Sequence, residues 1–143
     1  MKTHSLNEHF SVAPQVGLED LKTLSQQGFR SVLCLRPDGE AEDQPAFASI
    51  QAEAAALGMT TAYLPLATIA ESNDHLDAFD TLIATLPKPV LSYCRSGIRA
   101  ASLWALSELA ARPAEDVQRV ALAAGYDVST ALAQLAELER KSS

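Results

Sequence analysis

Residues 92–100 read SYCRSGIRA and join an apolar run to a helix-like sequence. The run at 88–93, KPVLSY, predicts a buried strand, and the apolar positions from Ile98 to Ala111 recur at helical period. A loop between a strand and a helix directs the first N–H groups of the helix outward and adds the positive end of the helix dipole. The stretch therefore predicts an anion site with Cys94 at its mouth.

The residue types of this loop favour nucleophilic chemistry. Positive charge and a helix N-terminus stabilise a thiolate, which is the nucleophilic form of cysteine. Gly97 lets the backbone curl around a ligand, Arg99 offers a planar fork for a tetrahedral oxyanion, and Arg95 adds positive charge. We expect Cys94 and Arg99 to be catalytic. We expect the residues between them to bind the substrate: Arg95, Ser96, Gly97 and Ile98.

A cysteine at the end of a strand is more often a small buried apolar residue than a nucleophile. Cys34 lies inside the apolar run FRSVLCL at 29–35 and fits that description. We assign it no role. The arginines, the glycine and the strand–helix junction around Cys94 favour chemistry there instead.

Strands and helices alternate along the rest of the chain. Helices are expected at 17–28, 45–57, 72–86 and 98–111, strands at 29–35, 60–66 and 88–93, and two more helices after Pro113. This order predicts an α/β fold: a parallel sheet of about four or five strands, flanked by helices. We expect one domain over residues 1–143, with a C-terminal helical pair (about 113–140) packed on it.

Composition limits the function. The chain has 143 residues, 48% of them hydrophobic, and a net charge of −7, which argues against nucleic-acid and membrane partners. Two cysteines are too few for a disulfide framework, and neither a signal-peptide core nor a long apolar run occurs, so we expect a cytoplasmic protein. No metal-ligand spacing or nucleotide loop appears. The sequence thus predicts no cofactor, a small anionic substrate and no particular oligomeric state.

The loop resembles the signature of cysteine phosphatases, in which a Cys and an Arg bracket an anion cradle. The whole chain resembles the beta-lactamase hydrolase-like protein family, in its phosphatase-like domain. The matching stretches are VAPQ, LEDLKTLSQQGFRSVLCLRPDGE, AYLPL, PVLSYCRSGIRAASLWAL and AGYDVS. The resemblance implies a bacterial source and a fold like that of dual-specificity phosphatases. It also implies Cys94 as the nucleophile and Arg99 as the anion clamp.

The loop departs from the phosphatase pattern in two ways. Only four residues separate Cys94 from Arg99, one fewer than in the usual phosphatase loop. That length is similar to the active loop of rhodaneses, whose cysteine carries a persulfide sulfur. Ala100 stands where phosphatases often have a Ser or Thr that supports the thiolate.

A general acid is also missing from its usual place. Phosphatases of this kind carry an Asp soon after the strand that ends in a proline, whereas Ala67 and Thr68 follow Pro65 here. Three carboxylates remain as possible stand-ins: Asp74, Glu71 and Asp38. A leaving-group acid typically contributes about 10²–10⁴-fold to the rate, so its absence would harm phosphoester hydrolysis more than persulfide transfer.

Three functions follow from these observations. The first is a cysteine-dependent phosphatase that forms a phosphocysteine at Cys94. The second is a sulfurtransferase that carries a persulfide on the same residue, which the short loop and the missing acid favour. The third is an inactive module that keeps the fold and binds an anion or a partner. The phosphatase is the primary prediction, because the whole-chain likeness supports it. That likeness fixes the fold better than the reaction, since one scaffold can host several chemistries.

Overall fold

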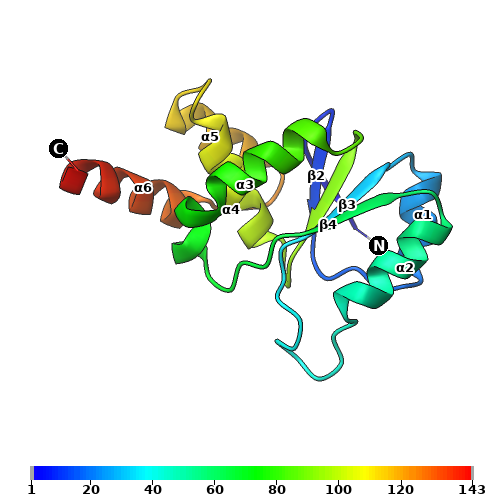
Figure 1. The fold of residues 1–143 in the computed structure, drawn as a ribbon. Helices are drawn as coiled ribbons and strands as arrows, with labels where there is room; N and C mark the ends of the chain where they lie inside the picture. Colours follow the sequence, from blue (N-terminus) through cyan, green and yellow to red (C-terminus); the bar gives the residue numbers. More distant parts are fainter. Residues whose placement is uncertain (1, 143) are drawn as a thin grey trace.

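The computed structural model describes residues 2–142. Its elements in chain order are β1 (His4–Asn7), β2 (Phe10–Ala13), α1 (Asp20–Gln26), β3 (Ser31–Cys34), α2 (Phe47–Ala56), β4 (Thr60–Tyr63), the 3₁₀ turn η1 (Ile69–Glu71), α3 (Ser72–Thr85), β5 (Val90–Tyr93), α4 (Ile98–Glu108), α5 (Ala114–Ala123) and α6 (Ser129–Ser142). Figure 1 shows them in sequence colours, with the C-terminal helices on one side of the sheet and α1 and α2 on the other.

The sheet has the strand order β1-β2-β5-β3-β4. Strand β1 runs antiparallel to β2, and the remaining pairs are parallel. Strand β5 lies in the middle, and its last residue, Tyr93, pairs with Ala13 on one side and Cys34 on the other. In open α/β sheets ligands bind at the carboxyl ends of the strands. The residue that follows β5 therefore stands at the centre of the edge where a site is expected.

Burial of the strands reflects this order. All four residues of β5 and of β3 are buried, because helices cover both faces of the sheet there. The edge strand β4 leaves Thr60 and Tyr63 exposed. One core cluster joins α1 and α2 to the sheet and includes Cys34 and Tyr93, and the other joins α3, α4 and the C-terminal segment to the opposite face and includes Cys94.

The expected α/β architecture is confirmed, with one addition and some shorter elements. The hairpin β1–β2 was not predicted, because its strands are four residues long and no glycine marks the turn; Asn7 Oδ1 instead accepts a hydrogen bond from His9 N (2.8 Å). The strand predicted over 60–66 ends at Tyr63, and Pro65, which has no N–H, follows. The sheet is therefore mixed, with four parallel strands and one antiparallel edge strand.

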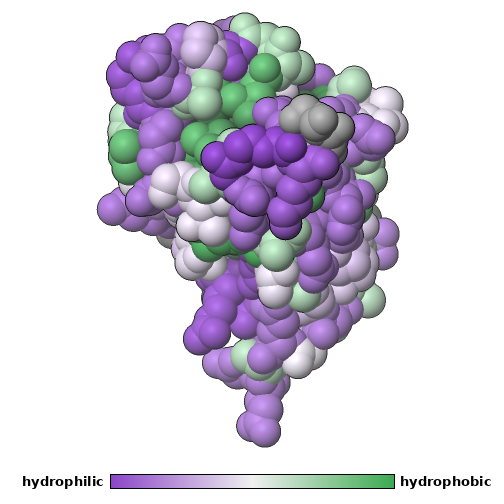
Figure 2. All heavy atoms as spheres, turned by 90° about the vertical axis from the view of Figure 1, so that its left-hand side faces the viewer, coloured by the Kyte–Doolittle hydropathy of each residue, from purple (hydrophilic) through white to green (hydrophobic). Residues whose placement is uncertain are grey.

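The two C-terminal helices form where they were expected, and Pro113 precedes the first residue of α5. This C-terminal segment adds four buried apolar side chains to the core cluster that contains α4: Val117, Ala121, Tyr126 and Val128. Figure 2 faces this side of the molecule and shows a mostly hydrophilic surface, with hydrophobic residues visible between the hydrophilic ones. Within residues 2–142, no helix combines the length and apolar character that crossing a membrane requires.

Candidate active site

Cys94 directly follows β5 and is fully buried. Its Sγ accepts a hydrogen bond from the backbone N of Gly97 (3.1 Å). Gly97 is the N-cap of α4 and has a φ of 99°, a backbone angle that residues with a Cβ rarely adopt. The sharp turn at Gly97 thus brings the start of α4 back onto the thiol, where an N–H and the helix dipole both favour negative charge on sulfur.

The carbonyl groups of the loop are held on its outer side. Arg95 O accepts from Gln15 N (3.2 Å), and Ser96 O accepts from the Tyr126 hydroxyl (3.1 Å). In a trans peptide the C=O and the following N–H point in opposite directions. Fixing these two carbonyls outward therefore turns the N–H groups of Ser96 and Gly97 toward the interior of the loop, as an anion cradle requires.

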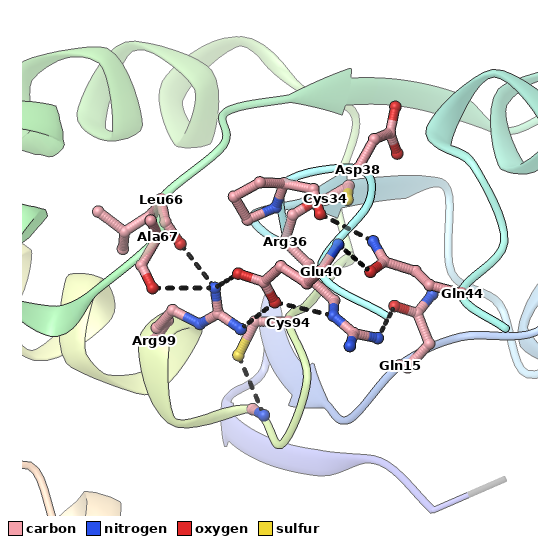
Figure 3. Close-up of polar contacts among 12 residues, drawn as sticks. Gln15, Cys34, Arg36, Asp38, Glu40, Gln44, Leu66, Ala67, Cys94 and Arg99 are labelled. Atoms are coloured by element: carbon pink, nitrogen blue, oxygen red, sulfur yellow. Dashed lines mark hydrogen bonds and ion pairs between the residues drawn. The ribbon is translucent and has the colours of Figure 1, made fainter. Parts of the chain in front are cut away.

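Arg99 lies in the first turn of α4 and is only 8% exposed. Its Nη1 donates to Leu66 O (2.8 Å) and, with Nη2, forms a two-pronged ion pair with the Glu40 carboxylate (2.7 and 2.9 Å) (Figure 3). The hydrogen bond to Glu40 is the main cause that raises the pKa of Arg99, and Cys94, which Figure 3 shows beside the guanidinium, adds to it. The arginine is fixed in place and charged.

Glu40 joins two buried arginines. Besides Arg99, its Oε1 accepts from Arg36 Nε (2.9 Å), and Arg36 Nη1 donates to Gln15 Oε1 (2.9 Å). Hydrogen bonding to Arg99, followed by that to Arg36, lowers the pKa of Glu40 to about 2. Glu40 is therefore a carboxylate at neutral pH; it aligns Arg99 and cannot serve as a proton donor.

The three carboxylates expected as stand-in acids lie in two places, one after β3 and two at the η1–α3 junction. Asp38 is exposed in the loop after β3, and its Oδ1 accepts from Phe47 N (2.8 Å), which fixes the turn before α2. Glu71 ends η1, and Asp74 is exposed in the first turn of α3. A role for any of them as the acid stays a prediction.

His75 is half-buried, with Nδ1 3.0 Å from Glu71 O. Among the described residues, no group of three or more His, Cys, Asp or Glu side chains is arranged to hold a metal ion. The chemistry that the loop and its partners offer is thus that of the Cys94 thiol, the Glu40 carboxylate, the loop N–H groups and three arginines: Arg36, Arg95 and Arg99.

Cys34 occupies a different environment, although it ends the neighbouring strand. It is buried on the α1–α2 side of the sheet, and its Sγ donates to Arg36 O (3.3 Å). Burial is the main cause that raises the pKa of Cys34. This agrees with its interpretation as a small buried residue.

Four contributors to the site were not found by sequence reasoning: Gln15, Arg36, Glu40 and Tyr126. All four stand in stretches that carried the family resemblance, VAPQ, LRPDGE and AGYDVS. Glu40 and Tyr126 lie 59 and 30 residues from their partners in the loop, so only the fold brings them together.

Known proteins support the fold and its class. The family described as beta-lactamase hydrolase-like protein, phosphatase-like domain, matches residues 2–112. The beta-lactamase hydrolase-like protein of Xylella fastidiosa (strain Temecula1) is 32% identical over 137 residues, which are 94% of this chain and 32% of that protein. The chain thus spans about a third of the length of the curated relatives that it matches.

Solved structures agree. A candidate phosphatase from Neisseria meningitidis Z2491 superimposes with a TM-score of 0.81 at 32% identity, covering 89% of this chain and 91% of that one. Tk-PTP in its active form shares the fold alone, with a TM-score of 0.70 at 14% identity and 96% of both chains covered. The fold is therefore that of the cysteine and protein-tyrosine phosphatases.

Proposed function

The chain belongs to the family of the beta-lactamase hydrolase-like protein, phosphatase-like domain, and from this we propose that it is a cysteine-dependent phosphatase acting on a small phosphate ester. The observation that carries the proposal is the contact between Gly97 N and Cys94 Sγ, beside the fixed guanidinium of Arg99. A nucleophile and an anion clamp are thereby held at the N-terminus of one helix.

In the first step the Cys94 thiolate attacks phosphorus and the ester oxygen leaves with its bonding electrons, taking a proton from water or a nearby acid. The N–H groups of the loop and Arg99 hold the equatorial oxygens, whose charge grows in the transition state. In the second step water attacks phosphorus, the S–P bond breaks, and inorganic phosphate and the thiolate are released.

Sulfur transfer is the second candidate, and the four-residue spacing of the loop favours it. In that reaction the Cys94 thiolate attacks the outer sulfur of thiosulfate, sulfite leaves, and a persulfide remains on the cysteine. Cyanide or a thiol then removes the outer sulfur and restores the thiolate. No alkoxide has to be protonated, so the reaction needs no acid beside the loop.

The two reactions are separated by assaying one preparation on an aryl phosphate and on thiosulfate with cyanide. We expect release of phosphate from the aryl ester, lost in Cys94→Ser and kept in Cys34→Ser. Turnover of thiosulfate alone would replace the phosphatase with the sulfurtransferase. Turnover of neither substrate, with inorganic phosphate still bound, would favour the inactive anion-binding module and contradict both enzymes.

A further inference from the structure

Tyr126, which lies between the two C-terminal helices, touches the loop from outside the region that the family matches. We propose that Tyr126 is a positioning residue: its hydroxyl fixes the Ser96–Gly97 peptide so that Gly97 N–H points at Cys94. This role concerns the site of the proposed function, and its importance for catalysis rests on that function.

Both ends of that one peptide are held. Tyr126 Oη donates to Ser96 O at 3.1 Å, and Gly97 N donates to Cys94 Sγ at 3.1 Å. Because the peptide is planar and trans, its carbonyl cannot turn without carrying the N–H away from the sulfur. Glycine has little preference between the two signs of φ, so Gly97 alone does not fix the direction of the peptide. The hydrogen bond from the Tyr126 hydroxyl to Ser96 O fixes that direction.

The phenol also fills the space beside Gly97. A Cβ added to Gly97 would lie 2.2 Å from Tyr126 Oη and 2.8 Å from its Cζ. Tyr126 is 9% exposed, and its ring meets the His4 ring edge-on at a centroid distance of 5.4 Å. The loop and the ring therefore pack so closely that the Tyr126 phenol fits only because residue 97 has no side chain.

The backbone around Tyr126 is tied to α5, which makes it a firm support. Tyr126 N donates to Ala121 O (2.9 Å), and Asp127 Oδ1 accepts from Gln118 Nε2 (2.8 Å) and Ser129 N (2.9 Å). Gln118 Oε1 in turn accepts from Val128 N (3.1 Å). Four hydrogen bonds thus fix the segment that presents the phenol.

The hydroxyl keeps its proton over a wide pH range. Burial is the first cause that raises the pKa of Tyr126, and the nearby Cys94 is the second. A neutral phenol can donate to the Ser96 carbonyl, whereas a phenolate would repel it. The contact is accordingly present at neutral pH.

The test is Tyr126→Phe, which removes the hydroxyl and keeps the ring. At pH 7 we expect iodoacetamide to alkylate Cys94 about 5- to 10-fold more slowly than in the wild type, the size of one net hydrogen bond. The dissociation constant for inorganic phosphate, measured by calorimetry, should rise by a similar factor. Neither readout requires turnover, so an absence of phosphatase activity in the wild type would contradict the proposed function and leave this result standing.

Two controls accompany the variant. Tyr63→Phe removes another tyrosine hydroxyl, which accepts from Asp38 N (2.9 Å) away from residues 94–99, and should alkylate at the wild-type rate. Buried Cys34, followed in the same sample, reports any general loosening of the fold. The proposal is overturned if Cys94 in Tyr126→Phe reacts within twofold of Tyr63→Phe, or if both cysteines become more reactive together.

Discussion

The β3–α2 and β5–α4 junctions both begin with a buried cysteine at the carboxyl end of a parallel strand. The two sulfur atoms take opposite roles in their hydrogen bonds. Cys34 Sγ donates to a carbonyl, Arg36 O (3.3 Å), and burial is the main cause that raises the pKa of this thiol. Cys94 Sγ instead accepts from an N–H, that of Gly97 (3.1 Å), and lies at the N-terminus of α4. The direction of one hydrogen bond distinguishes a core residue from a candidate nucleophile.

The chain that follows each strand explains this difference. After β5 the helix begins at Ile98, and the left-handed Gly97 turns its N–H back onto the sulfur. After β3 the chain forms a long loop, and the next helix begins only at Phe47. That loop contributes Arg36 and Glu40 to the site around Cys94 and Arg99.

The largest expected difference between the junctions is in turnover. Cys94→Ser should lower turnover by about 10³-fold or more, since a serine hydroxyl beside an N–H donor is far less nucleophilic than a thiolate. Cys34→Ser should keep the wild-type rate, measured as phosphate released from an aryl ester. Equal losses in the two variants would remove the distinction between the junctions.

Replacing the arginine of the active junction should have the next largest effect. Arg99→Lys keeps the charge but loses the two-pronged pairing with Glu40, so kcat/KM for the aryl ester should fall about 10²–10³-fold. Arg119→Lys, on the exposed face of α5, is the matched control and should behave as the wild type. An active Arg99→Lys enzyme would show that a point charge is enough.

Reactivity of the two thiols in the unmodified protein comes third. At pH 7 iodoacetamide should modify Cys94 about 100-fold faster than Cys34, because burial raises the pKa of Cys34 and leaves little of it as thiolate. Peptide mapping by mass spectrometry at timed intervals gives both rates in one experiment. Comparable slow rates would contradict a thiolate at the start of α4.

The smallest effect concerns the carboxylate that the β3–α2 loop supplies. Since the folded-state pKa of Glu40 is about 2, against an ordinary 4.5, its stabilising effect is complete above about pH 4.5 and is lost as the pH falls toward 2. Glu40→Gln should lower the free energy of unfolding by about 1.5–3 kcal/mol at neutral pH, nearer the lower figure because the side chain is 25% exposed. Urea titrations should show that the difference in free energy of unfolding between variant and wild type is smaller at pH 3 than at pH 7. A gap independent of pH would mean that the charge of Glu40 is not involved.

Much of the fold was readable in the sequence because local signals and global topology agree. Apolar runs such as 88–93, bounded by a proline and a polar loop, predicted the central strands, and the helical period after Gly97 predicted α4. The position of Cys94 at a helix start needed only local sequence. Its place at the centre of the sheet followed from the alternation of strands and helices.

The parts that escaped prediction depend on distant partners. Strand β2 becomes a strand by pairing with β5, 80 residues later, and β1 by pairing with β2. Glu40 reads locally as the end of a turn, and Tyr126 as an apolar position before a helix. Their contacts with Arg99 and Ser96 exist only after the whole sheet has formed.

The position of β5 between β2 and β3 also bears on how the protein folds. Residues 90–93 insert between strands that are synthesised much earlier, and this long-range pairing must wait for most of the chain. The same insertion places Cys94 beside Gln15 and the loop after β3. We therefore expect the candidate nucleophile and the sheet to form in one late step, so that partly folded chains lack the site and the reactivity of the Cys94 thiol reports the completion of folding.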